Sequence, residues 1–302
     1  MNTRQSIQAP QPFPQNGNWY KAALHVHTST SDGDTDVAAR LRQYREAGYQ
    51  VVAITDHWKT NDLAGFSDDA FLAINSMEAH PKTSTGAPAH HLVCLDLPHP
   101  FELDRALPAQ AVVDRVRAAG GIVIYGHPHW TEHSIEEMRE AVGFSAIEIY
   151  NSHCDFASAK GYSDAHADQA FSKLGLFGLT AVDDTHNSVW LNRGWTMIRA
   201  KALTKSDIMR AIASGHYYAS TGASITDFRI ENGSACIKCS PAAQIRFFFN
   251  GAGGGRVETA KSGTPLTEAR WDFAGNKSTL KWIRAEVVGF DGKRAWTNPL
   301  AV

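Results

Sequence analysis

Short apolar segments alternate with amphipathic segments along the first two thirds of the chain. Continuous apolar runs at residues 49–56, 122–125 and 176–182 are typical of strands that are buried on both faces of a sheet. Residues 36–47 and 109–119 have helical spacing of their apolar positions instead. Strands that alternate with helices predict a parallel α/β sheet or barrel.

Residues that favour helix starts precede several amphipathic segments. Asp36 and Ser134 are expected N-caps, and Thr204 begins a capping box in which Asp207 replaces the usual Glu. Further strands are expected at residues 20–27, 71–77, 92–97, 146–150 and 196–200, and further helices at residues 134–142, 164–174 and 204–214.

The pattern changes after Gly222, beyond which no helical spacing occurs. Asn232-Gly233 separates two short strand-like runs and is a strong signal for a type I′ hairpin, and Asp291-Gly292 marks another turn. We therefore expect three regions, namely a polar tail over residues 1–18, a barrel over residues 19–222 and a small β-sandwich-like domain over residues 223–302.

Composition excludes several classes of protein. The 302 residues are 43% hydrophobic and 20% charged, and the net charge of −2 gives no attraction to nucleic acid or to an anionic membrane. No apolar run reaches the roughly 20 residues of a bilayer span, and no secretory h-region is visible. Four cysteines in a chain of this length form no disulfide framework, so a cytoplasmic location is expected.

Histidine is abundant, with 14 in the chain, and many lie at the ends of expected strands. His25 and His27 are two apart on a strand, so both side chains leave the same face and can bind one metal ion. Asp184 and His186 repeat this spacing. A single pair could equally be hydrogen-bonded core histidines, but the recurrence, with His127 on a third strand, favours a multinuclear metal centre at one mouth of the barrel.

Two pairs of neighbouring residues leave alternatives open. Asp56 and His57 are adjacent, so on a strand they face opposite ways, and one of them reaches the metals while the other supports the backbone. Only one of His90 and His91 need be a ligand.

Other candidates have ordinary structural alternatives. Asp32 lies in a Ser-Asp-Gly segment that is also a common turn. Glu78 follows a strand-like run and could bridge two metals or lie on the surface. Cys236 and Cys239 form a CxxC without a second pair, so they are interpreted as packing residues.

Taken together, the motifs resemble the PHP (polymerase and histidinol phosphatase) superfamily of metallohydrolases. The matching pieces are HVHTSTSDG, AITDH, Glu78, HHLVCL, GIVIYGHPH and AVDDTH, in family order over residues 20–220. The resemblance implies an α/β fold, a distorted seven-stranded (β/α) barrel with the metal site at the C-terminal ends of its strands, to which the pattern after Gly222 adds a small C-terminal all-β domain. It favours His91 over His90 and Asp184 over Asp183. The implied ligands are His25, His27, Asp32, His57, Glu78, His91, His127, Asp184 and His186.

The resemblance also implies how the ligands divide among two or three divalent transition-metal ions. The residue types suit Zn, Mn or Fe. Glu78, His127 and Asp184 are the expected catalytic residues, and a hydroxide that bridges the metals is the expected nucleophile. The implied groups are His25, His27, Glu78 and Asp184 for one ion, Glu78, His91 and His127 for a second, and Asp32, His57 and His186 for a third.

The expected substrate is a small phosphorylated ester, with no nucleic-acid or membrane partner. Arg193 is a candidate clamp for an anionic substrate, and His129 and Asn151 are further candidate contacts. A second resemblance, through Arg193-Gly-Trp195 and residues 204–222, is to the branch that includes carbaryl (carbamate ester) hydrolases. It supports the alternative of a carboxylic or carbamate ester hydrolase. A third hypothesis is a binding or regulatory protein with structural metals.

Overall fold

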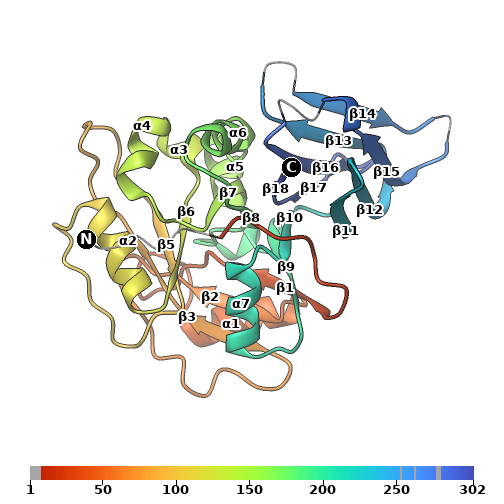
Figure 1. Ribbon diagram of the computed structural model, residues 1–302. Helices are drawn as coiled ribbons and strands as arrows, with labels where there is room; N and C mark the ends of the chain where they lie inside the picture. The colour runs from red at the N-terminus through yellow and green to blue at the C-terminus, as the bar shows by residue number, and fades with distance from the viewer. Residues whose placement is uncertain (1–7, 252–253, 262, 277–279) are drawn as a thin grey trace.

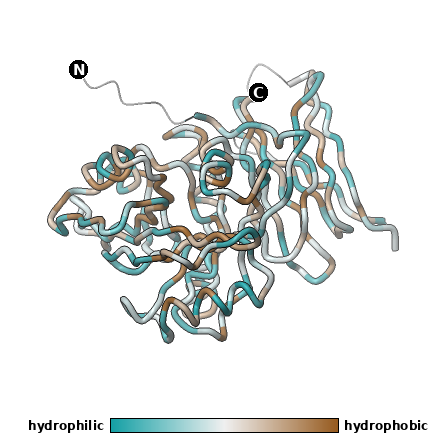
Figure 2. Tube along the Cα trace, turned by 90° about the horizontal axis from the view of Figure 1, so that it is seen from below, coloured by the Kyte–Doolittle hydropathy of each residue, from teal (hydrophilic) through white to brown (hydrophobic). Residues whose placement is uncertain are grey.

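The computed structural model describes residues 8–251, 254–261, 263–276 and 280–302. A mixed α/β part is followed by an antiparallel β part, drawn from teal to blue in Figure 1. In the described residues the strands form sheets of ten, five and three strands. Figure 2 shows hydrophobic stretches of the chain running through the interior of the α/β part, while its outer turns are more hydrophilic.

The five-stranded sheet supplies one side of the α/β part. Every residue of its strands is buried, as the continuous apolar runs predict. β6, β7 and β8 are parallel, whereas β5 is antiparallel to both of its neighbours. In order across the sheet the strands are β4 (Met77–Ala79), β5 (Leu92–Leu95), β6 (Ile122–Tyr125), β7 (Ala146–Asn151) and β8 (Gly178–Val182).

The ten-stranded sheet supplies the other side. β1, β2 and β3 are parallel, and β9 and β10 extend this sheet in antiparallel fashion. These strands are β1 (Asn18–Ala23), β2 (Val51–Ile54), β3 (Leu72–Asn75), β9 (Trp195–Ala200) and β10 (Tyr217–Ser220).

The expected seven-stranded barrel is not closed, which corrects the sequence-based prediction. β3 and β4 follow each other in sequence but belong to different sheets, and β8 is in a different sheet from β1 and β9. Isolated bridges span the two openings, His57 to Glu78 at one and Val26 to Thr185 at the other. Both openings lie where polar ligand-type residues replace the apolar strand residues, so the regular ladders end there.

The helices confirm the capping signals. The Asp36 side chain accepts a hydrogen bond from the Ala39 N–H at 2.7 Å, Ser134 and Glu137 form a capping box, and Thr204 caps the last helix. The helix expected at 134–142 is shorter, because a 3₁₀ turn follows it at Arg139–Ala141. The helices are α1 (Val37–Glu46), α2 (Ala109–Ala118), α3 (Pro128–Thr131), α4 (Ile135–Met138), α5 (Ser152–Ser158), α6 (Asp164–Lys173) and α7 (Lys205–Ala213).

The C-terminal strands continue the larger sheet and also form a separate three-stranded sheet. Asn232 and Gly233 have φ values of 48° and 76°, which confirms the predicted hairpin type. β17 pairs with β10, so the ten-stranded sheet runs from the α/β part into the β part. The strands are β11 (Ile225–Glu231), β12 (Ser234–Ala242) and β15 (Leu266–Asp272) in the small sheet, and β13 (Gln244–Phe249), β14 (Gly255–Thr259), β16 (Trp282–Val288), β17 (Arg294–Thr297) and β18 (Leu300–Ala301) in the large one.

A partly buried ion pair joins the C-terminal strands to helix α6. Arg284 on β16 is fully buried and donates to both carboxylate oxygens of Asp168, at 2.7 and 2.9 Å. The indole N–H of Trp296 donates to Asp164 at 3.1 Å.

In the described residues no helix has the length and apolar character needed to cross a membrane.

We expect Arg284→Ala to lower the free energy of unfolding by about 2 kcal/mol, because it removes two charged hydrogen bonds that the buried guanidinium donates to the partly exposed Asp168. Arg229→Ala is the control, since its pairs with Asp227 and Glu231 are part-exposed and worth at most about 1 kcal/mol. Denaturant unfolding measures both. Equal losses would show that the Arg284 pair does not anchor the C-terminal strands.

Candidate metal centre

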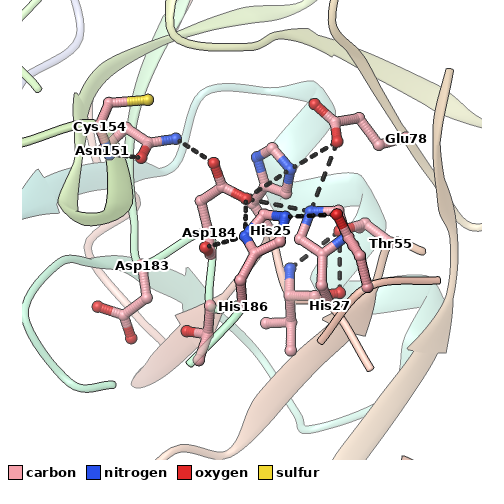
Figure 3. A network of polar contacts seen from close by, with 12 residues as sticks. His25, His27, Thr55, Glu78, Asn151, Cys154, Asp183, Asp184 and His186 are labelled. Atoms are coloured by element: carbon pink, nitrogen blue, oxygen red, sulfur yellow. Dashed lines mark hydrogen bonds and ion pairs between the residues drawn. The ribbon is translucent and has the colours of Figure 1, made fainter. Parts of the chain in front are cut away.

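Ligand-type side chains converge at the ends of strands from both halves of the α/β part (Figure 3). They reach one another although up to 161 residues separate them in sequence, from His25 to His186. His25 and His27 follow β1, His57 follows β2, Glu78 lies on β4, His91 precedes β5, His127 follows β6, and Asp184 and His186 follow β8.

Glu78 lies at the middle of this cluster and is only 1% exposed. One of its oxygens, Oε1, is 2.7 Å from His91 Nδ1 and 3.5 Å from His127 Nε2. The other, Oε2, is 2.9 Å from His57 Nδ1, 3.3 Å from His25 Nε2 and 3.5 Å from His27 Nε2. A buried carboxylate whose two oxygens face different imidazoles has the arrangement needed to bridge two cations.

Asp184 faces Glu78 across the cluster, whereas Asp183 turns away from it (Figure 3). Asp184 Oδ1 lies 3.0 Å from His27 Nε2 and 3.3 Å from His25 Nε2. Asp183 instead accepts hydrogen bonds from the backbone N–H groups of residues 192–194, at 2.7 to 2.8 Å. The φ of 54° at Asp184 is rare for a residue with a side chain and places local strain at the cluster.

Asp32 forms the more open side of the cluster. Its Oδ2 is 3.2 Å from His57 Nε2 and 3.3 Å from His186 Nε2, and its side chain is 50% exposed. The turn that carries it requires glycine next in sequence, because a Cβ on Gly33 would lie 2.7 Å from the carbonyl of His27. The Ser-Asp-Gly segment is therefore a turn and also brings a carboxylate to the cluster.

Asp56 supports this turn, which resolves one sequence alternative. Its carboxylate accepts from the backbone and hydroxyl of Thr28 at 2.8 and 2.7 Å, and from Ser31 Oγ at 2.6 Å. Asn61 donates to the same carboxylate at 2.8 Å. His57, on the opposite side of the chain, is the member of the pair that reaches the cluster.

The structure separates His90 from His91 in the same way. Both nitrogens of the buried His90 ring have partners away from the cluster, Tyr125 Oη at 2.9 Å and Glu140 Oε2 at 3.1 Å. His91 lies against Glu78 and packs on the Trp130 ring at 5.4 Å.

We expect His91→Ala to lose metal and activity, whereas His90→Ala should mainly lose stability. Removing the His90 ring leaves buried polar partners at Tyr125 and Glu140 unpaired, at a cost of about 1–3 kcal/mol. Metal content, turnover and thermal unfolding of both variants test this. Equal losses of metal would mean that the choice of His91 is incorrect.

Two of the predicted substrate contacts, Arg193 and His129, have different neighbours in the structure. Arg193 is exposed, and its guanidinium lies 5.4 Å from the centre of the Phe156 ring. His129 Nδ1 is 2.8 Å from the Tyr162 carbonyl, and its ring lies 5.5 Å from that of His166. Substrate binding by both residues stays a prediction.

Asn151, the third predicted contact, is fully buried behind Asp184. Its amide nitrogen donates to Asp184 Oδ2 and Glu148 Oε2, both at 3.0 Å. Its oxygen accepts from the Cys154 N–H and begins helix α5. These bonds position Asp184, and contact with a substrate stays a prediction.

Two further residues belong to the cluster. The sequence left the role of Glu148 open between a contact near the metals or substrate and an ordinary surface or core position, and His80 was not among the predicted residues. Glu148 is fully buried, with Oε1 2.7 Å from His25 Nδ1 and Oε2 accepting from the His127 N–H. This contact leaves Nε2 of His25 free to bind a metal, as carboxylates behind metal-binding histidines do. His80 Nε2 lies 3.1 Å from Glu78 Oε2. The signal that could have identified His80 is the Glu-x-His spacing at the end of β4, which repeats the i, i+2 spacing of His25 and His27.

Unpartnered buried atoms show that the cluster fits metal ions. A buried polar atom without a hydrogen bond costs free energy, and bound cations would satisfy several such atoms here together. The arrangement suits more than one ion. The unpartnered atoms in the cluster are His25 Nε2, His27 Nε2, His57 Nδ1, His80 Nε2, His127 Nδ1 and Asp184 Oδ1.

The electrostatics of the cluster favour ionised carboxylates. Burial alone raises the pKa values of Glu78 and Asp184, but the neighbouring histidines, His25 first, hold both well below their ordinary values. Burial lowers the pKa of His57, yet the neighbouring carboxylates of Asp32 and Glu78 outweigh it and raise that pKa to about 10. In the metal-free protein His57 therefore carries a proton at pH 7.

We expect metal uptake at pH 7 to release protons, because a metal needs the lone pair that the proton occupies on His57. Since its pKa is raised, the affinity should fall as the pH falls, by up to about tenfold per pH unit for each proton released. Calorimetric titration in two buffers of different protonation enthalpy measures the release. Equal heats in both buffers would contradict the assignment.

The sequence matches no protein-family model and no curated protein. Solved structures do match the fold. One is a two-domain protein from Bacteroides vulgatus ATCC 8482 that contains a predicted PHP-like metal-dependent phosphoesterase, with a TM-score of 0.55 and 14% identity over 99% of this chain and 100% of the other. Another is PsfC from Pseudomonas syringae PB-5123, with a TM-score of 0.50 and 16% identity over 66% of this chain and 90% of the other.

The chain thus shares its fold with these structures, and its buried histidine and carboxylate cluster suits several metal ions. The resemblance found in the sequence motifs is confirmed at the level of the fold.

Proposed function

We propose that this protein is a metal-dependent hydrolase of a small phosphate ester. The observation that carries the proposal is the placement of the buried Glu78 between histidines on both of its oxygens, opposite Asp184. Two or three Zn, Mn or Fe ions fit these donor types. When bound, such ions lower the pKa of a water molecule and offset the negative charge that builds up on an ester oxygen.

The residues of the chain prepare this site. Glu148 fixes the tautomer of His25, and Asn151 orients Asp184. Trp130, 39% exposed, packs against His91 and His127 and shields that side from water. In the described part of the chain, every ion pair of Glu78, Asp184 and Asp32 is with a histidine, so no lysine or arginine competes with a metal ion for these carboxylates. The pairs are with His25, His27, His57, His80, His91, His127 and His186.

One observation favours a second candidate, the hydrolysis of a carboxylic or carbamate ester. The Arg193 guanidinium is exposed and packs on the Phe156 ring at the surface. A neutral ester needs no cationic clamp. The third hypothesis, of structural metals only, is less consistent with Asp32, whose 50% exposure leaves that side open, whereas structural sites are closed.

A substrate panel tests the proposal. Full-length protein reconstituted with Mn or Zn should hydrolyse p-nitrophenyl phosphate faster than p-nitrophenyl acetate or an aryl carbamate. Arg193→Ala should raise KM for the phosphate ester about tenfold or more, as loss of a charged hydrogen bond of about 1.5 kcal/mol does, and Arg193→Lys should recover part of it. Faster hydrolysis of the neutral esters, unaffected by Arg193→Ala, would favour the second candidate.

A further inference from the structure

His80 belongs to the cluster although it is outside the nine ligands that the resemblance implies. It lies two residues after Glu78, directly beyond β4, so both side chains leave the same side of the chain. Its ring stacks on His91 with centroids 4.0 Å apart and meets the edge of His57 at 4.3 Å. Trp58 covers its outer side at 6.3 Å.

Two imidazole nitrogens and one carboxylate oxygen point to the same place. His80 Nε2 and His57 Nδ1 lie 3.1 and 2.9 Å from Glu78 Oε2. Both nitrogens are buried, and neither has a hydrogen-bond partner despite these short distances. The three ligand atoms lie within 4.8 Å of one another. The three atoms therefore converge without forming hydrogen bonds with one another. Imidazole nitrogens and a carboxylate oxygen that converge in this way are suitable ligands for a transition-metal ion.

The other nitrogen of His57 has a different neighbour. His57 Nε2 lies 3.2 Å from Asp32 Oδ2. A neutral imidazole has one N–H and one lone pair, so one nitrogen donates while the other binds a metal. If Nδ1 binds the metal, Nε2 donates to Asp32, and the carboxylate behind the histidine fixes its tautomer, as Glu148 does for His25.

We propose that His80 is a metal ligand, and that His80 Nε2, His57 Nδ1 and Glu78 Oε2 hold one cation at the edge of the centre. Asp32 then positions His57 by accepting its Nε2–H. This proposal rests on the proposed function only in that both need a metal-loaded centre. It assigns His57 to the same ion as His80, instead of to an ion held with Asp32 and His186.

Metal content of the full-length protein tests this assignment. His80→Phe keeps a ring that can stack on His91 but removes the donor nitrogen. His80→Asp restores a donor atom. After equilibrium dialysis against a limiting concentration of Mn or Zn, elemental analysis should show about one ion per chain fewer in His80→Phe and recovery in His80→Asp. His99→Phe is the matched control, since His99 contacts Thr60 outside the cluster.

A double-variant comparison identifies the shared ion. His57→Phe should lose the ion that His80→Phe loses, so combining the two changes should remove no further ion. Absorption of the Co-substituted protein should lose the same ligand-field band in both variants. A His80→Phe protein with the metal content, affinity and Co spectrum of the parent would overturn the proposal, as would separate, additive losses in the double variant.

The hydrolase proposal fails separately from this one. A parent protein that binds several ions but hydrolyses no ester in the panel contradicts the proposed function, while the metal counts of the His80 variants still decide the ligand assignment. A parent protein that binds no metal contradicts both.

Discussion

Glu78→Gln is expected to abolish the proposed ester hydrolysis, with kcat reduced about 10³-fold or more, while the metal-free protein stays folded. The carboxylate is buried among histidines, and an amide can replace neither its charge nor its second oxygen donor. A thousandfold loss corresponds to roughly 4 kcal/mol of transition-state stabilisation. Single-turnover kinetics and elemental analysis of the same preparation measure both effects.

The matched control is Glu136→Gln, which changes the same atoms on the exposed face of α4. It should keep the kcat and the metal content of the parent protein. A Glu78→Gln protein with near-normal turnover and metal content would show that Glu78 is not shared between ions.

A chain that ends at Gly222 is expected to lose its folded structure. The sheet continues from β10 into β17, so truncation would leave the buried strand β10 paired only with β9 and with its other edge unpaired. Asn298 reaches back into the α/β part, where its oxygen accepts from the Leu179 N–H at 2.7 Å and its amide nitrogen donates to the carbonyls of Gly215 and Tyr217. Soluble yield and circular dichroism measure the effect.

Asn298→Ala in the full-length chain separates stability from chemistry. It should lower the free energy of unfolding by about 1–3 kcal/mol, because three buried backbone groups lose their partner, and should leave the metal content unchanged. A truncated chain that is soluble, folded and metal-loaded would instead support two independent domains divided at residue 222.

Local signals explain which parts of the fold could be predicted. The caps at Asp36, Ser134 and Thr204 and the Asn232-Gly233 turn each depend on a few neighbouring residues, and all four are as expected. The open barrel could not be predicted, because strand pairing across the sheet is decided by distant segments. Nothing in the apolar run of β5 distinguishes an antiparallel strand from a parallel one.

In the metal centre, too, some features follow from the spacing of neighbouring residues, and others depend on backbone conformation or on distant contacts. The i, i+2 spacing of His25 and His27 places both rings on one side of a strand, and this could be read directly. Asp183 and Asp184 could not be separated by spacing, because a left-handed backbone at Asp184 decides which carboxylate faces the histidines. The role of Glu148 depends on a contact across 123 residues.

Elemental analysis of the purified full-length protein tests the multinuclear metal centre most directly. Protein made in medium supplemented with Zn, Mn or Fe and dialysed against metal-free buffer should carry two or three transition-metal ions per chain, because the buried donors are too many for one ion. Less than one ion per chain, with no uptake on reconstitution, would contradict the account.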